Sequence, residues 1–187
     1  FVAVVIAKEA FGGLGQNIFH PALIGYAVLF LLAPEWFSQS SEQLTRWSQW
    51  FLIRQSASLG TASFFAVIFS AAVLLYKRWI SRLPPFLYLA ALGGLSICLG
   101  RNPFDELVNS SIFLAAFFFL ADPVTTPITR KGQVTFAVVA AFLTALLRFW
   151  AAPLPAALGS IFFLNGFVPL LDRYPARADK QESVTKK

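Results

Sequence analysis

The sequence predicts an all-α membrane protein: a polytopic bundle of transmembrane helices in which two helices are broken. Three observations lead to this prediction. The 187-residue chain is 57% hydrophobic and 13% charged, with a mean hydropathy of +0.67, whereas soluble domains carry about 25% charged residues. Its apolar residues form repeated runs separated by short polar segments. Two of these runs stop at polar breaks bounded by glycine or proline, and such breaks often mark binding sites in transporters.

The first break is the sequence FGGLGQNIFHP, which lies between the apolar runs 1–7 and 22–33. Neither run reaches the ~20 residues that a helix needs to cross a bilayer core, and we expect run 1–7 to be the end of a longer span. Gly12 and Gly13 permit close backbone approach, and Pro21 suits the first turn of the next helix. The free N–H groups there suit a phosphate, a quinone carbonyl or a flavin oxygen. A kink with tight helix packing is the alternative.

Six apolar runs follow in order, and each predicts a helix. They cover residues 22–33, 58–76, 86–99, 111–121, 134–150 and 156–171. If each run crosses once, the basic segments 77–82, 130–131 and 173–187 share one side, and the loops 35–56, 101–109 and 151–155 share the other. Because loops rich in Lys and Arg face the cytoplasm, we expect a transmembrane domain over residues 1–172 and a charged cytoplasmic tail over residues 173–187.

The second break, DPVTTP, follows the short run 111–121. Asp122 could carry a cation or a proton, or it could cap the end of the half-helix. Thr125 and Thr126 add hydroxyl groups that donate and accept hydrogen bonds. A short run followed by a break occurs once in each half of the chain, which predicts two structural repeats with a site between them.

Three further residues carry predictions of their own. His20 is the sole histidine, which favours a hydrogen-bonded structural role over metal binding. Cys98, the sole cysteine, lies in an apolar run and is expected to be a small buried side chain. Arg148 lies near the outer end of its run and is expected to extend to the membrane interface. The sequence shows no nucleophile–base pair and no metal-ligand spacing, so we expect neither catalytic residues nor a metal. The +6 net charge lies in loops and the tail, which indicates membrane topology and not nucleic-acid binding.

Three segments carry a resemblance to a known family. AKEAFGGLGQNIFHPALIGYAVLFLLAP resembles a signature of the RnfD/NqrB family, whose members are membrane subunits of ion-pumping electron-transfer complexes. FFFLADPVTTPITRKGQ is similar to the second family signature, and LLRFWAAPLPAALGSIFFLNGFVPLLDRY also fits. The resemblance implies half-helices and inverted repeats like those of urea transporters. It also implies flavin and quinone chemistry in the bacterial inner membrane, within a hetero-oligomer of other membrane subunits.

The resemblance and the breaks together nominate a cofactor or ion site. Its candidate residues are Gly12, Gly13, Asn17, Asp122, Thr125 and Thr126. Family members attach FMN to a threonine in a Ser-Gly-Ala-Thr-like motif, and Thr45 can be placed opposite that threonine. Here the loop is shortened and Glu42 and Leu44 stand where small residues belong. We therefore expect Thr45 to be unmodified and any FMN or riboflavin to be bound non-covalently or by a neighbouring subunit. His20 stands where the family usually has asparagine.

These observations favour an integral membrane subunit of an Rnf/Nqr-like electron-transport complex. Such a subunit would hold or border a flavin or a quinone, and it would couple electron transfer to cation movement. Its partners would be the lipid bilayer and the other membrane subunits of a redox complex, with no nucleic acid. Two alternatives stay open: a cofactor-free structural or accessory subunit of another membrane redox complex, and a small-solute channel or transporter on the same fold.

Overall fold

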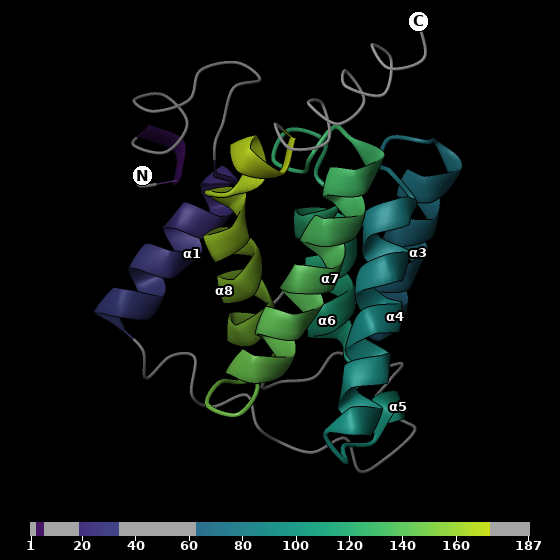
Figure 1. Ribbon diagram of the computed structural model, residues 1–187. Helices are drawn as coiled ribbons and strands as arrows, with labels where there is room; N and C mark the ends of the chain where they lie inside the picture. The colour runs from purple at the N-terminus through teal and green to yellow at the C-terminus, as the bar shows by residue number, and fades with distance from the viewer. Residues whose placement is uncertain (1–2, 6–18, 34–62, 173–187) are drawn as a thin grey trace, which may run out of the picture.

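The computed structural model describes residues 3–5, 19–33 and 63–172, and within these ranges all regular structure is helical (Figure 1). The α-helices are α1 (Pro21–Leu32), α3 (Phe64–Tyr76), α4 (Leu83–Cys98), α5 (Pro103–Leu107), α6 (Ser110–Leu114), α7 (Arg130–Leu147) and α8 (Pro153–Asn165), and a π-helix, η4 (Ala115–Leu120), continues α6. The prediction of an all-α protein is confirmed. Residues 121–129 contain no helix, so the chain leaves helical structure at the predicted second break.

Helices α1, α3, α4, α7 and α8 occupy runs that the sequence marked as helical, but several of their ends differ. Helix α4 begins at Leu83, ahead of the predicted residue 86, because Pro84 and Pro85 fit a first helical turn, where a missing N–H costs nothing. Helix α7 begins at Arg130, ahead of the predicted residue 134, because the Thr129 side chain caps it. The predicted span 156–171 is divided by a turn at residues 166–167.

The segment 101–109, which we predicted to be a loop, contains helix α5. The Asn102 side chain accepts a hydrogen bond from the Phe104 N–H at 3.1 Å, and Pro103 occupies the first turn. Asp105 and Glu106 lie in that turn, where carboxylates favour the positive end of the helix. The short Asn-Pro-x-Asp-Glu pattern is therefore a helix start that the polar composition concealed.

Helix α7 lies between α4 and α8 at the centre of the bundle (Figure 1). Small buried residues allow this close packing: Ala137, Ala140, Ala141, Ala156 and Ala157. The outer surface carries large apolar side chains, among them Leu31, Phe69 and Phe142, which are 78%, 72% and 55% exposed. Such a surface suits lipid or partner subunits and not water. Cys98 also lies on this outer surface, so the expectation that it is buried was wrong.

Helix length gives a separate measure of membrane character. Among the described residues, Arg130–Leu147 alone is both long and apolar enough to cross a bilayer, and the other apolar helices are shorter. The bundle has two opposite ends, and hydrogen bonds between segments far apart in the sequence identify which segments meet at each. At one end, Ser81 donates a hydrogen bond to Gln133 at 3.4 Å, and Asp172 accepts hydrogen bonds from the 122–129 segment. Ser81 lies in the loop that carries Lys77 and Arg78, and Gln133 lies in the first turn of α7 beside Arg130 and Lys131. We call this the basic end.

At the opposite end, Arg101 contacts the backbone oxygen of Arg148, and the Arg148 side chain bonds to Glu106 and Ala151. These contacts join the segments 101–109 and 151–155. The alternation of the loops, which we predicted from the basic residues, therefore holds for the described part of the chain. Which end faces the cytoplasm stays a prediction.

Candidate functional site

The first part of the candidate site is the start of helix α1 at the basic end. His20 is the residue before the first turn, and its Nδ1 accepts a hydrogen bond from the Ala22 N–H at 3.2 Å. Pro21 occupies the first helical turn, as predicted. Because Nδ1 accepts, the neutral ring carries its proton on Nε2, which is left to donate elsewhere. His20 thus has the hydrogen-bonded structural role that the sequence favoured, together with a second ring nitrogen that can donate.

The second part is the turn that follows η4. Thr125 donates its hydroxyl to a carboxylate oxygen of Asp122 at 2.9 Å. Thr126 donates its hydroxyl to the backbone oxygen of Leu120 at 2.6 Å, and its N–H binds the backbone oxygen of Asp122 at 3.1 Å. Both threonines are buried. The Thr126 hydroxyl therefore caps the backbone oxygen of Leu120, the last residue of the π-helix, and the Asp122 side chain instead accepts from Thr125.

The two parts lie next to one another. The His20 ring is 5.0 Å from the Phe119 ring of η4, between centroids. The Asp122 carboxylate is close enough to interact electrostatically with His20. The structure thus brings the end of the first break beside the start of the second. Gly12, Gly13 and Asn17 lie outside the described residues, as does Thr45.

Asn165, at the end of α8, is a site residue that the sequence reasoning did not nominate. Its side chain is fully buried, and neither its amide nitrogen nor its amide oxygen has a hydrogen-bond partner in the described structure. The next residue, Gly166, lies against the Phe19 ring, which itself packs 5.0 Å from Phe162. Asn165 therefore belongs to the same group of helix ends as His20. An asparagine that closes an apolar run was the signal in the sequence.

An unpaired buried amide costs about 1–3 kcal/mol, so native proteins rarely keep one without a bound group. The Asn165 amide can donate two hydrogen bonds and accept two. His20 Nε2 adds a donor at the neighbouring helix end, and the Asp122 carboxylate adds an acceptor. These groups lie among aromatic rings. The arrangement therefore offers hydrogen-bond donors and acceptors next to aromatic rings.

Asp172 holds the far side of the second break in place. Its carboxylate accepts hydrogen bonds from the Ile128 N–H at 3.1 and 3.2 Å, from the Thr129 N–H at 3.2 Å and from the Thr129 hydroxyl at 3.1 Å. The Thr129 hydroxyl oxygen also accepts from the Gly132 N–H at 3.1 Å. A carboxylate at the N-terminus of a helix is favoured by the helix dipole. Asp172 therefore anchors both α7 and the turn that contains Asp122.

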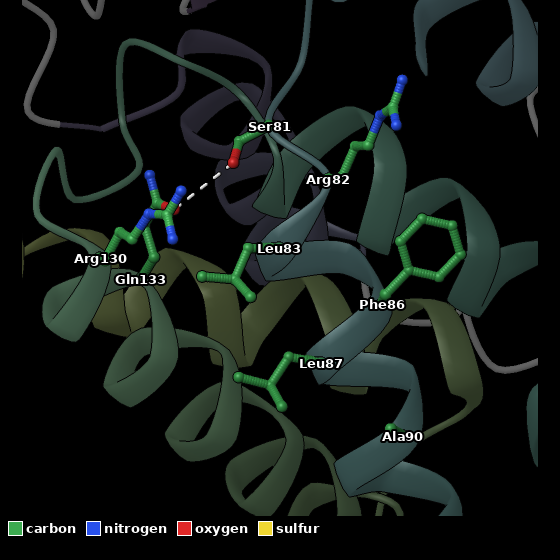
Figure 2. A pocket seen from close by; sticks show the side chains of 8 residues that line it. All are labelled: Ser81, Arg82, Leu83, Phe86, Leu87, Ala90, Arg130 and Gln133. Atoms are coloured by element: carbon green, nitrogen blue, oxygen red, sulfur yellow. Dashed lines mark hydrogen bonds between the residues drawn. The ribbon is translucent and has the colours of Figure 1, made fainter. Parts of the chain in front are cut away.

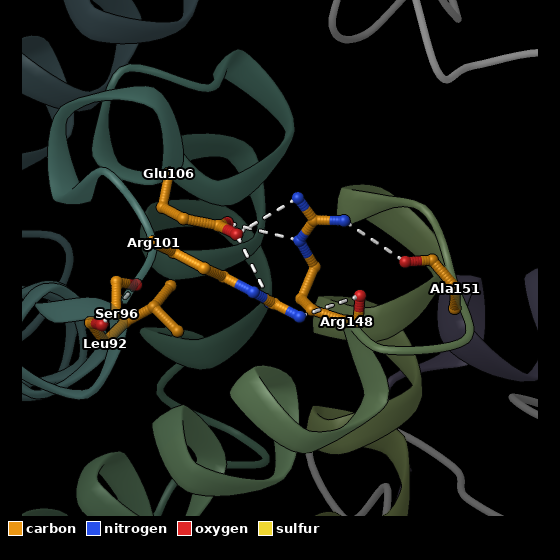
Figure 3. A network of polar contacts seen from close by, with 6 residues as sticks. All are labelled: Leu92, Ser96, Arg101, Glu106, Arg148 and Ala151. Carbon is orange, nitrogen blue, oxygen red and sulfur yellow. Dashed lines mark hydrogen bonds and ion pairs between the residues drawn. The ribbon is translucent and has the colours of Figure 1, made fainter. Parts of the chain in front are cut away.

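A second polar cluster occupies the opposite end of the bundle (Figure 3). The Arg148 side chain donates two hydrogen bonds to Glu106, from Nε and Nη2, each at 3.1 Å. Arg101 lies 3.6 Å from the same carboxylate, and its guanidinium also stacks over the Phe149 ring at 4.4 Å. Arg148 therefore pairs with a buried glutamate at the end of α7, and its extension to the membrane interface stays a prediction. The sequence missed this partner because Glu106 was assigned to a loop.

A row of buried hydroxyls joins α4, α7 and α8 in the interior. Tyr88 donates to Thr144 at 3.0 Å, and the Thr144 and Ser160 hydroxyl oxygens are 2.7 Å apart. Ser160 also binds the backbone oxygen of Ala157 at 2.8 Å. These bonds fix the relative positions of three helices. Among the described residues, no group of three or more His, Cys, Asp or Glu side chains could hold a metal ion.

Comparison with known proteins gives one family. A sequence model of the NQR2, RnfD, RnfE family matches residues 1–180. The chain is 29% identical to a subunit of the proton-translocating ferredoxin:NAD(+) oxidoreductase complex of Clostridium ljungdahlii, in an alignment that covers 93% of this chain and 64% of the relative. It is 26% identical to the corresponding subunit of the Na(+)-translocating ferredoxin:NAD(+) oxidoreductase complex of Acetobacterium woodii, with 92% and 62% covered. The chain thus spans less than two thirds of the length of these relatives.

Proposed function

Because the chain belongs to the NQR2, RnfD, RnfE family, we propose that it serves as a membrane subunit of an Rnf/Nqr-like electron-transport complex. It holds or borders a flavin or a quinone there, and the complex couples electron transfer to cation movement. The relatives are named as subunits of ion-translocating oxidoreductase complexes. Other membrane subunits of a hetero-oligomer are the partners that this function requires.

The observation that carries the proposal is the fully buried amide of Asn165, which has no hydrogen-bond partner among the residues that the structure describes. The edge of a flavin ring presents carbonyl oxygens beside a ring N–H, so one amide can both donate to it and accept from it. A quinone presents carbonyl oxygens alone, to which the amide and His20 Nε2 can donate. Phe119 and Phe162 offer apolar surroundings for either ring. When bound, the flavin or quinone supplies the electron-accepting ring, and the protein supplies position and electrostatics.

The remaining parts of the proposal concern the first break and the membrane. Gly12, Gly13 and Asn17 would complete the site from the first break, where glycine allows close approach of a ring to the backbone. The basic end would face the cytoplasm, with the C-terminus on that side of a bacterial inner membrane. Two broken helices and an inverted repeat would place the site between the halves of the fold. Thr45 would lie outside and unmodified.

The proposal is tested in the purified complex with the variant Asn165→Leu. Leucine resembles asparagine in size, and it removes the amide while relieving the cost of an unpaired polar group. We expect the variant complex to assemble normally and to lose at least about 10-fold in non-covalently bound flavin or quinone, as loss of two buried hydrogen bonds implies. Ser96→Ala is the matched control, because Ser96 is buried but bonds within its own helix. Bound flavin and quinone are measured by fluorescence and chromatography after acid precipitation.

Two results would contradict the proposal. The first is a complex whose content of bound flavin and quinone is not lowered by Asn165→Leu, or which contains neither molecule before the substitution. The chain is then better described as a cofactor-free structural subunit or as a solute channel. If intact-mass measurement finds an FMN adduct on this subunit that Thr45→Ala removes, the non-covalent part of the proposal is wrong.

A further inference from the structure

An open groove of about 660 Å³ lies on the outer surface at the basic end, between the starts of α4 and α7 (Figure 2). It is lined by Ser81, Arg82, Leu83, Phe86, Leu87, Ala90, Arg130 and Gln133. None of these residues belongs to the candidate cofactor site. We propose that this groove binds one anionic phospholipid of the surrounding bilayer, independently of the redox function proposed above.

The polar part of the groove suits a phosphate-bearing headgroup. Arg82 and Arg130 stand on opposite sides of it, at the starts of α4 and α7, and both side chains are exposed. Among the described residues, neither arginine pairs with a carboxylate, and the lining contains no acidic residue. The hydrogen bond from Ser81 to Gln133, at 3.4 Å, ties the two sides together. Two unpaired guanidinium groups are complementary to an anion, whereas a quinone headgroup has no charge to match them.

The apolar part suits an acyl chain. Its lining follows helix α4 through Leu83, Phe86, Leu87 and Ala90. At a rise of about 1.5 Å per residue, these positions extend over about 10 Å of the helix. Phe86 is 53% exposed, and its ring packs on the Phe117 ring with 5.6 Å between the centroids. These residues lead away from the basic end and along the membrane direction of the bundle. A bound molecule therefore needs a charged head and an apolar tail in that order.

The groove also lies at the right depth. Tyr76 and Trp79, in the adjacent end of α3 and the loop after it, are 82% and 66% exposed. Exposed tyrosine and tryptophan at helix ends gather at the level of the lipid headgroups. Lys77 and Arg78 lie between them, outside the groove. The two arginines of the groove are thus at headgroup level, and its apolar floor is within the hydrocarbon region.

The test uses the delipidated complex in mild detergent, with phosphatidylglycerol carrying a fluorescent acyl chain as the probe. We expect Arg82→Gln with Arg130→Gln to weaken binding about 25-fold, since each basic residue near an anionic lipid is worth about 5-fold. The matched control, Lys77→Gln with Arg78→Gln, removes the same charge at the same end outside the groove and should change binding less than about 3-fold. Ala90→Trp fills the floor and should weaken binding about 10-fold by displacing two or so methylene groups.

Competition separates a lipid from a free anion. Unlabelled phosphatidylglycerol should displace the probe, whereas phosphatidylcholine and excess inorganic phosphate should not. Displacement by inorganic phosphate, or an unchanged affinity in Ala90→Trp, would show a simple anion site and overturn the proposal. Equal weakening by the two double variants would show unspecific surface charge and would overturn it as well. Failure of the unaltered complex to bind the probe would show that a neighbouring subunit covers the groove, and this too would refute it.

Discussion

Replacing Glu106 with alanine removes the carboxylate that holds two arginine side chains at one end of the bundle. The Glu106 side chain is 7% exposed, and the Arg148 side chain, which makes two hydrogen bonds to it, is 22% exposed. Breaking a buried ion pair by removing one partner costs about 3–5 kcal/mol. Because both arginine side chains keep some exposure and can turn outward, we expect a loss near the lower end, about 3 kcal/mol of unfolding free energy.

The reverse substitution differs for a structural reason. Arg148→Met leaves Glu106 buried, but Arg101 remains 3.6 Å away as a second cation, so we expect a loss of about 2–3 kcal/mol. In the double variant no unpaired charge remains from this pair. Its loss of unfolding free energy should therefore be about 2 kcal/mol smaller than the sum of the losses in the two single variants. Asp105→Ala is the matched control on the same helix, because Asp105 is exposed; it should cost no more than about 0.5 kcal/mol.

Reversible unfolding in mixed micelles, followed by tryptophan fluorescence, gives these free energies. The reasoning fails if Glu106→Ala is as stable as Asp105→Ala. It also fails if the losses in the double variant simply add, because the two side chains would then act independently.

Three further predictions concern packing and hydrogen bonds, and each is measured by the same unfolding assay. Asp172→Ala should lower the unfolding free energy by about 1.5–3 kcal/mol, because charge-assisted hydrogen bonds to the start of α7 are lost. Asp172→Asn should lower it by less. Equal stability of the two variants and the unaltered protein would contradict this. Gly132→Ala should lower the unfolding free energy by about 1–3 kcal/mol, since a Cβ there would lie 2.6 Å from the Thr129 hydroxyl that caps α7. Its control is Gly94→Ala in helix α4, where a Cβ would meet nothing within 4 Å. This substitution should raise the unfolding free energy by about 0.5–1 kcal/mol. Tyr88→Phe should lower the unfolding free energy by about 0.6 kcal/mol, an average value for a hydrogen bond between membrane helices. Thr144→Val should lower it by more, because it removes the partner of both the Tyr88 and the Ser160 hydroxyl groups; the opposite order would refute the central place of Thr144 in this row.

Much of the fold follows from local patterns that a sequence displays directly. Apolar runs predicted α1, α3, α4, α7 and α8, and proline in the first turn predicted the start of α1. The alternation of basic loops predicted which loops share an end of the bundle. The errors were also local: a capped start such as Asn102-Pro103 was read as loop because its composition is polar. A cap is decided by two or three residues, which a window of average composition hides.

The candidate site was predictable in part. The sequence nominated Asp122, Thr125 and Thr126 at the second break, and the structure places them in one hydrogen-bonded turn. It did not nominate Asn165, because a single amide in an apolar run shows nothing of its surroundings. Whether that amide is paired or left without a partner depends on which neighbouring helices surround it.

The sequence by itself determined the class of the protein, the approximate helices and the positions of the polar segments, because hydrophobic runs, prolines and caps act on the nearest few residues. The tertiary structure alone decided that His20 lies beside Phe119, that Glu106 pairs with Arg148, and that Cys98 faces outward. These outcomes depend on residues far apart along the chain. They follow from how the helices pack against one another, which is a property of the tertiary structure and not of local pattern.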